Sequence, residues 1–167
     1  LVGSEMCIRD RYADKYGYQY AVQLDGDGQH RPEYLESMIK KMEEGYDIVI
    51  GSRFVGEKKP FTMRMLGSNL IELAIRFTTG VNIKDPTSGM RMFSKRMIRE
   101  FASGLNYGPE PDTVSYLIRQ GARVAEVPVI MDERILGVSY LTPVNAMRYM
   151  LKMLISILLI QNFRKRR

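Results

Sequence analysis

The 167-residue sequence has one cysteine, Cys7, and one histidine, His30, which excludes the chemistry that needs clusters of these side chains. A single cysteine cannot form an internal disulfide framework or a Cys-rich metal cluster, and a single histidine cannot build a multi-histidine zinc site. Long apolar runs are also lacking, because the run at 153–160 is far short of the roughly 20 residues of a membrane-spanning helix. Residues 1–11 do not have the basic stretch and apolar run of a signal peptide.

The composition is that of one globular domain. Hydrophobic residues make up 45% and charged residues 26% of the chain, and its length allows a real core. The net charge of +6 favours anionic partners such as phosphates, lipid headgroups or nucleic acid, without choosing among them. No internal repeat and no low-complexity linker is visible in the sequence.

The most informative stretch is an acidic turn that directly follows a predicted strand at 18–24. Asp25 and Asp27 stand at i and i+2, which places both carboxylates on one face of an extended segment. Two such carboxylates repel each other unless a cation lies between them, and Mg²⁺ or Mn²⁺ prefers oxygen ligands. Gln29 continues the series with an amide oxygen. We therefore expect a metal site of Asp25, Asp27 and Gln29 at the carboxyl end of a strand.

The remaining patterns predict an α/β fold. A helix that begins near Pro32 and ends at Gly45 separates the first strand from a buried strand at 46–51, which predicts a βαβ unit. Asp112 is expected to cap a helix, and Pro128 marks its strand as an edge or a strand end. The further elements are expected as helices at 61–79, 95–102, 113–120 and 142–162 and strands at 90–93 and 124–130.

The N-terminus has a different character from the rest. Residues 1–11 show neither helical nor strand periodicity, and they resemble translated adaptor sequence, so we expect a non-native leader in which Cys7 has no role. Residues 12–16 are expected as the tail of a helix that Gly17 closes.

Four segments resemble inverting family-2 glycosyltransferases of the GT-A fold, especially polyprenyl-phosphate sugar transferases related to dolichol-phosphate mannose synthase. Residues 25–30, Asp-Gly-Asp-Gly-Gln-His, are similar to the family's metal motif, and 51–54 to the strand end that opens its acceptor loop. Residues 85–91 are similar to its Asp-x-x-Ser-Gly-Phe-Arg segment, and 126–140 to its closing strand and Arg-containing loop. Their order along 12–160 makes the resemblance specific.

The resemblance implies a GT-A fold, a mixed sheet flanked by helices, with residues 12–141 as the C-terminal portion of the catalytic domain. Family members begin with a strand and a Pro-x-Tyr-Asn-Glu-like segment that binds the nucleotide base, and no segment here matches it. We therefore expect the front half of the nucleotide site to be missing and the chain to be an N-terminally truncated fragment. Residues 142–167 are expected as an amphipathic helix with a basic tail.

The resemblance also implies roles for the site residues. The three metal ligands named above would hold Mg²⁺ or Mn²⁺ against the diphosphate of a nucleoside diphosphate sugar. Arg53, Arg64 and Arg134 would contact phosphates of the donor or of a lipid acceptor. Asp112 falls where relatives carry an acidic residue near the sugar, and Glu110 is a candidate for the same role as general base.

Other readings of the acidic turn stay open. A solvated turn is the simplest, and an EF-hand-like calcium loop would use Asp25, Asp27, Gln29 and Glu36, although His30 replaces the glycine that such a loop needs. A haloacid-dehalogenase-type phosphatase also has two aspartates after a strand, but its later lysine and acidic pair are not found.

Two further side chains near the motifs are more ordinary. Arg91 is at least as well explained by a structural pair with Asp85 or a nearby carboxylate as by a site role. His30 is expected to pack beside the metal motif rather than to bind the metal.

The last helix is either a core helix or an amphipathic helix on a membrane, with the basic residues 164–167 on anionic headgroups. We favour the membrane, since a polyprenyl acceptor lies there, and expect the protein on its cytoplasmic face without nucleic acid as a partner. The predicted function is metal-dependent, inverting transfer of a sugar from a nucleoside diphosphate sugar to a polyprenyl phosphate or cell-envelope glycan. The alternative is a module that binds divalent cations or membranes without catalysis.

Overall fold

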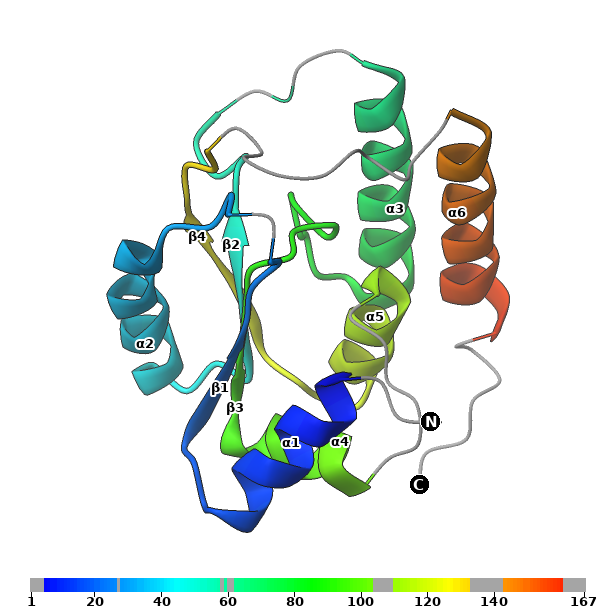
Figure 1. The fold of residues 1–167 in the computed structure, drawn as a ribbon. Helices are drawn as coiled ribbons and strands as arrows, with labels where there is room; N and C mark the ends of the chain where they lie inside the picture. The colour runs from blue at the N-terminus through cyan, green and yellow to red at the C-terminus, as the bar shows by residue number, and fades with distance from the viewer. Residues whose placement is uncertain are drawn as a thin grey trace.

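A four-stranded mixed sheet forms the centre of the computed structural model, which describes residues 5–26, 28–57, 59, 62–103, 110–132 and 143–160 (Figure 1). β3 is antiparallel to both of its neighbours, and β2 is parallel to β4. The carboxyl ends of β1, β2 and β4 therefore meet at one edge of the sheet. In spatial order the strands are β1 (Tyr20–Gln23), β3 (Arg91–Ser94), β2 (Ile48–Ser52) and β4 (Val124–Pro128).

The position of β3 corrects the expectation of a simple βαβ unit. β1 and β2 are parallel, as predicted, but β3 lies between them, and its Phe93 stands opposite both Ala21 and Ile48. Such a pairing joins segments far apart in the chain, which local periodicity does not encode. The expectation for Pro128 is confirmed, because β4 is an edge strand and Pro128 is its last residue.

Different helices cover the two faces of the sheet. On one face α2 (Leu35–Glu43), preceded by the 3₁₀ turn η1 (Pro32–Tyr34), packs Met38 and Met42 against the strands. On the other face α3 (Met63–Thr79), α4 (Lys95–Ser103) and α5 (Pro111–Arg119) enclose the larger core around Ile48 and Ile50. The predicted helix closure by Gly45 is confirmed, since this residue has the left-handed φ of +88° that favours glycine.

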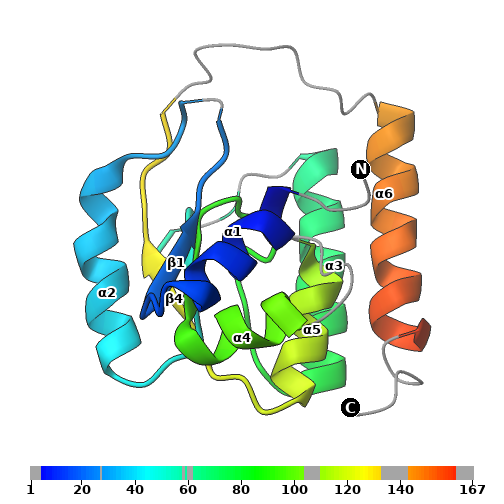
Figure 2. The same ribbon diagram turned by 60° about the horizontal axis from the view of Figure 1, so that its bottom comes forward.

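The N-terminal helix is longer than the sequence indicates. α1 (Glu5–Lys15) packs beside α4 across the end of the sheet opposite the three carboxyl ends (Figure 2). The predicted tail and the closing Gly17, with φ +73°, are confirmed. Residues 5–11 form a helix although they lack helical periodicity, because the contact with α4 stabilises the helix in the folded protein.

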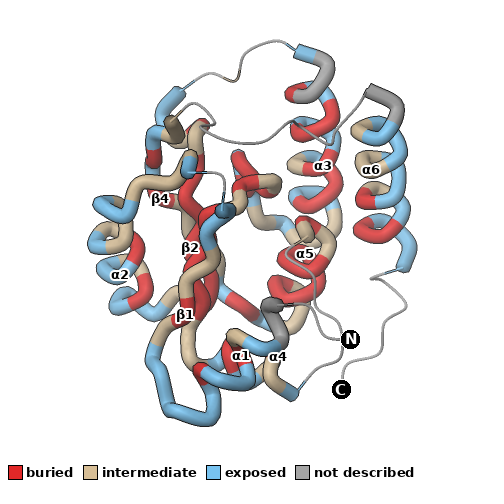
Figure 3. Tube along the Cα trace, in the orientation of Figure 1, coloured by how far each residue is buried: buried red, intermediate tan, exposed pale blue. Residues whose placement is uncertain are grey.

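The last helix, α6 (Pro143–Ile155), lies outermost, against α3, and continues as a π-helical turn, η2 (Ser156–Ile160). Gly67 of α3 permits this contact, because a Cβ there would lie 1.4 Å from the sulfur of Met150. Figure 3 shows that α6 buries one side and exposes the other. Within the described ranges, each helix is too short or too polar to cross a membrane.

Candidate functional site at the carboxyl edge of the sheet

Four segments gather at the edge where β1, β2 and β4 end (Figure 1). The acidic turn follows β1, Arg53 follows β2, and residues 129–132 follow β4. The turn at 85–90 leads into β3, which begins at this edge because it runs the opposite way. All four family-like segments therefore have residues at this edge, although they lie far apart in the chain.

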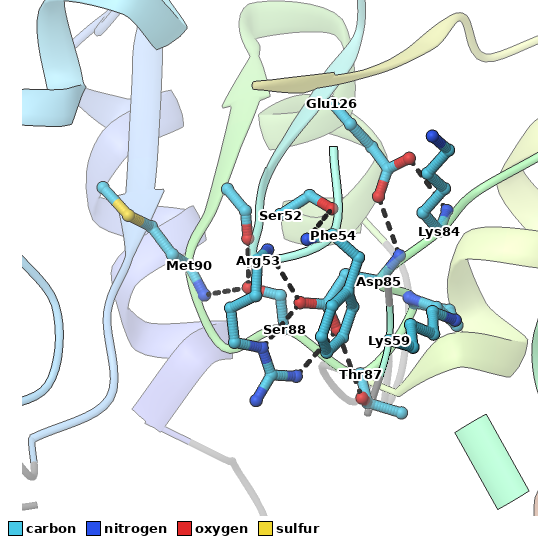
Figure 4. A network of polar contacts seen from close by, with 12 residues as sticks. Ser52, Arg53, Phe54, Lys59, Lys84, Asp85, Thr87, Ser88, Met90 and Glu126 are labelled. Atoms are coloured by element: carbon cyan, nitrogen blue, oxygen red, sulfur yellow. Dashed lines mark hydrogen bonds and ion pairs between the residues drawn. The ribbon is translucent and has the colours of Figure 1, made fainter. Parts of the chain in front are cut away.

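Asp85 anchors the turn at 85–90 (Figure 4). Its side chain is fully buried, and its carboxylate accepts hydrogen bonds from Arg53 Nε at 2.7 Å, Nη2 at 2.8 Å and the backbone N–H at 3.1 Å. The hydrogen bond to Asp85 raises the pKa of Arg53. Arg53, a predicted phosphate ligand, is thus oriented by a buried carboxylate at the end of β2, and its contact with a phosphate stays a prediction.

Glu126 of β4 holds Asp85 in turn. Its two carboxylate oxygens accept the backbone N–H groups of Lys84 and Asp85, each at 2.8 Å. The Glu126 carboxylate therefore positions the backbone that carries the buried Asp85 carboxylate. The same hydrogen bonds join the edge strand β4 to the turn (Figure 4). From the sequence, Asp85 was considered only as a structural partner of Arg91, and Glu126 had no role beyond its place in a family-like segment.

Arg91 holds the same turn through hydrogen bonds to its backbone. Its guanidinium donates to the carbonyls of Ser88 at 3.0 Å and Pro86 at 2.7 Å, and its side chain is buried. Burial lowers the pKa of Arg91, and the charges of nearby acidic groups oppose this effect. Ser88 adds a hydrogen bond from its hydroxyl to the carbonyl of Gly51, at 2.5 Å. A structural role for Arg91 is therefore observed, and the carbonyls of Ser88 and Pro86 are among its partners.

The acidic turn lies directly on Gly89. A Cβ at this position would be 2.0 Å from Oδ2 of Asp25, so only glycine lets the carboxylate rest there. Asp25 is 56% exposed, and His30 Nε2 lies 3.7 Å from its Oδ2. The His30 side chain is 4% exposed, and its Nδ1 has no hydrogen-bond partner within the described part of the chain. His30 packs beside the motif, as expected.

Gln29 and Arg31 join the acidic turn to the segment after β4. Gln29 Nε2 donates to the carbonyl of Asp132 at 2.9 Å, and the Asp132 N–H donates to the carbonyl of Gln29 at 3.0 Å. Arg31 Nε donates to the Asp132 carboxylate at 2.8 Å, and this pairing lowers the pKa of Asp132. Since Nε2 is the donor, Oε1 is the Gln29 atom that could serve a metal.

The donor chemistry fits a hard divalent cation, although the described residues supply only part of the expected set. Asp25 and Gln29 offer oxygen atoms, and no cluster of three Asp, Glu, His or Cys side chains occurs among the residues that the structure describes. Asp27 lies outside the described residues, as does Arg134. Arg64 belongs to the first turn of α3, and its side chain is likewise outside the description.

Glu110 and Asp112 lie at the start of α5 and face α6. The helix begins at Pro111, with Glu110 as its N-cap residue, so the expectation that Asp112 caps it is wrong. Proline is favoured in the first helical position, which moves the helix start forward and leaves Asp112 in the first turn. Asp112 Oδ2 accepts from the Ser156 hydroxyl at 2.6 Å, and Glu110 accepts from the Tyr149 hydroxyl.

This geometry defines a polar site at the strand ends of a mixed α/β sheet, and the family follows from the sequence comparison. Residues 9–102 match the family described as glycosyl transferase family 2, and the chain belongs to that family. Three of the four family-like segments, at 25–30, 51–54 and 85–91, lie within the matched residues.

Several curated relatives are similar over most of this chain. A polyprenol monophosphomannose synthase of Mycolicibacterium smegmatis is 33% identical over 81% of the chain and 54% of the relative. An undecaprenyl-phosphate mannosyltransferase of Micrococcus luteus is 33% identical over 77% of the chain and 56% of the relative. A dolichol-phosphate mannosyltransferase of Pyrococcus furiosus is 31% identical over 77% and 38%. The chain thus spans about half the length of the first two relatives.

Proposed function

We propose that this chain carries part of the catalytic domain of a metal-dependent glycosyltransferase, which transfers a sugar from a nucleoside diphosphate sugar to a polyprenyl phosphate. The observation that carries the proposal is the contact between the Asp25 carboxylate and Gly89. Gly89 belongs to the turn at 85–90, which hydrogen bonds of Asp85 and Arg91 hold in place. A carboxylate kept exposed at the carboxyl ends of strands is suited to a ligand rather than to the core. The names of the relatives support a sugar transferase with a polyprenyl-phosphate acceptor.

The residues at this edge would bind the diphosphate of the donor and the phosphate of the acceptor. Asp25, Asp27 and Gln29 would hold Mg²⁺ or Mn²⁺, which when bound neutralises charge on the departing diphosphate. Arg53 is held by Asp85 at the end of β2, and together with Arg134 it would offset the repulsion between donor and acceptor phosphates.

The acceptor decides what Glu110 and Asp112 do. An acceptor phosphate is ionised near neutral pH and needs little help from a base, whereas a sugar hydroxyl requires a general base. With a phosphate acceptor, the two carboxylates would instead accept hydrogen bonds from hydroxyls of the donor sugar. Both roles place them beside the sugar.

We also propose that the outer faces of α3 and α6 lie on the membrane, on its cytoplasmic side. Each helix exposes one apolar stripe, and the two helices pack side by side. Arg148 and Lys152 are exposed on α6 and could contact anionic headgroups. The stripes consist of Leu66, Leu70, Leu73 and Phe77 on α3 and of Met147, Leu151 and Ile155 on α6 with Leu159 on η2.

The test of the transferase uses the complete gene product, read from genomic DNA. Incubated with Mn²⁺, a nucleoside diphosphate sugar and polyprenyl phosphate in vesicles, it is expected to form the lipid-linked sugar. Asp27→Ala should lower this transfer about a hundredfold or more with folding intact, and Glu36→Ala, an exposed acidic residue of α2, should leave it unchanged. Transfer that persists in Asp27→Ala contradicts the proposal.

Calorimetry distinguishes the transferase from a cation-binding module. Nucleotide binding that requires Mn²⁺ supports the transferase, whereas tight calcium binding that is indifferent to nucleotide supports the module. Vesicle sedimentation tests the membrane face: Leu70→Glu with Leu151→Glu should release the protein from anionic vesicles, and Glu36→Ala should not.

A further inference from the structure

Two hydroxyl groups project from the protein-facing side of α6 and η2 onto the acidic pair at the start of α5. We propose that Tyr149 and Ser156 are positioning residues, which hold the carboxylates of Glu110 and Asp112 for the transfer reaction. This inference rests on the function proposed above. It assigns to the last helix a role in the site, in addition to any role at the membrane.

The helical spacing puts both hydroxyls on one face. Tyr149 and Ser156 are seven residues apart, about two turns, so their side chains point in similar directions. That face is otherwise packed: Met153 is 2% exposed and Ile157 is fully buried. Met150 is fixed over Gly67 of α3. The helix therefore has little freedom to slide, and its two hydroxyls are fixed relative to α5.

Tyr149 provides the partner of Glu110. Glu110 is the N-cap residue of α5, yet its side chain makes no capping hydrogen bond, and its carboxylate instead accepts from the Tyr149 hydroxyl. Burial raises the pKa of Tyr149, and the hydrogen bond to Glu110 raises it further. Tyr149 is consequently neutral at physiological pH and acts as a fixed donor to Glu110.

Ser156 provides the corresponding partner of Asp112. The serine hydroxyl donates to Oδ2 at 2.6 Å, while Oδ1 accepts from the backbone N–H of Thr113 at 2.9 Å. Each carboxylate oxygen thus has a donor, which fixes the rotation of the carboxylate as well as its position. Ser156 is 7% exposed, so its hydrogen bond is shielded from competing water.

Arg91 links this pair electrostatically to the rest of the site. Burial lowers the pKa of the Arg91 guanidinium, and interactions with the ionisable groups of Tyr149, Glu110, Asp85 and Asp25 oppose this effect. The guanidinium that braces the turn at 85–90 therefore interacts electrostatically with Glu110 and with Asp25.

A purely structural role for the two hydroxyls would be simpler, but apolar side chains would fill the same face without the cost of burying polar groups. A carboxylate that must meet one atom of a substrate gains from fixed partners, since small misplacements lower rates strongly. The activity of hydroxyl-free variants separates these two explanations.

The experiment compares Tyr149→Phe and Ser156→Ala in the complete gene product, with transfer to polyprenyl phosphate in vesicles as the readout. Each variant is expected to lower kcat about tenfold, because a misplaced carboxylate contacts the sugar less well in the transition state. Ser156→Thr keeps the hydroxyl and should restore kcat. Because Tyr149 acts through Glu110, adding Tyr149→Phe to Glu110→Gln should lower kcat no further.

The matched controls are Ser115→Ala and Tyr46→Phe. Ser115 is fully buried in α5, one turn from Asp112, and its hydroxyl has no hydrogen-bond partner among the described residues. Unchanged kcat in Tyr149→Phe and Ser156→Ala, or an effect that multiplies with Glu110→Gln, overturns the inference and leaves the transferase in place. A wild-type protein that transfers no sugar overturns the proposed function, and the inference falls with it.

Discussion

The turn at 85–90 and the acidic turn at 25–30 lie at the same edge of the sheet, yet they are held in opposite ways. Buried groups hold the first: Asp85 is fully buried and Arg91 is 2% exposed. The acidic turn is tied mainly by Arg31 and Asp132, whose side chains are 40% and 41% exposed. Gly89 of the buried turn lies in contact with the exposed carboxylate of Asp25 and so fixes its position. Stability is thus concentrated beneath the candidate ligands rather than in them.

Asp85→Ala should have the largest effect, a loss of about 3 kcal/mol in the free energy of unfolding. The substitution leaves Arg53 without its buried partner and removes the acceptor of three hydrogen bonds. The value is at the lower end for a buried pair because Arg53 is 27% exposed. Urea unfolding followed by circular dichroism measures it. Glu36→Ala, which breaks an exposed pair with Lys40, is the control, and equal midpoints for both variants would contradict the comparison.

Glu126→Gln should cost less, about 1–2 kcal/mol, because one of two acceptors becomes a donor that faces a backbone N–H. Since Glu126 acts by placing Asp85, the two substitutions should not be additive. The same urea experiment on the single and double variants tests this coupling. Glu57→Gln, an exposed loop residue, provides the background value. Additive losses would show that Glu126 and Asp85 stabilise the edge independently.

Gly89→Ala should change binding more than stability. The added Cβ meets the end of an exposed, flexible Asp25 side chain, which can rotate away at a cost of about 1 kcal/mol or less. The displaced carboxylate should then weaken Mn²⁺ binding roughly 10–100-fold. Calorimetry with Mn²⁺ and nucleotide on the complete gene product measures this. Gly56→Ala is the control for a change in stability alone, because its Cβ would meet no atom within 4 Å while its φ of +85° disfavours alanine. Unchanged Mn²⁺ affinity would separate Gly89 from the metal site.

The sequence predicted those parts of this edge that depend on local spacing. Asp25 and Gln29 were placed after a strand end from local spacing, and both follow β1 at this edge; their role as metal ligands stays a prediction. The helix closure at Gly45 followed from the same kind of local rule. These predictions need only neighbouring residues, so one sequence is sufficient.

The partners of the site residues could not be predicted in this way. Asp85 meets Arg53 from 32 residues away, and Asp132 meets Arg31 from 101 residues away. Both contacts depend on β3 and β4 taking their places in the sheet, which periodicity does not fix. Tyr149 was not predicted as a site residue, because a tyrosine on an apolar helix face is typical of a core. Its hydroxyl meets Glu110 only because α5 packs beside α6 and η2 in the fold.

Arg31→Gln should give the smallest effect, visible mainly through pH and salt. Arg31 lowers the pKa of Asp132, so the pair stabilises the folded state above the unfolded pKa of about 4 and loses this contribution as the pH falls through the lower, folded value. The difference in unfolding midpoint between wild type and Arg31→Gln should therefore be present at neutral pH and disappear in acid. Added salt at about 1 M should also reduce it, because both side chains are exposed. A difference that persists in acid and salt would mean that the acidic turn is held as firmly as the turn beneath it.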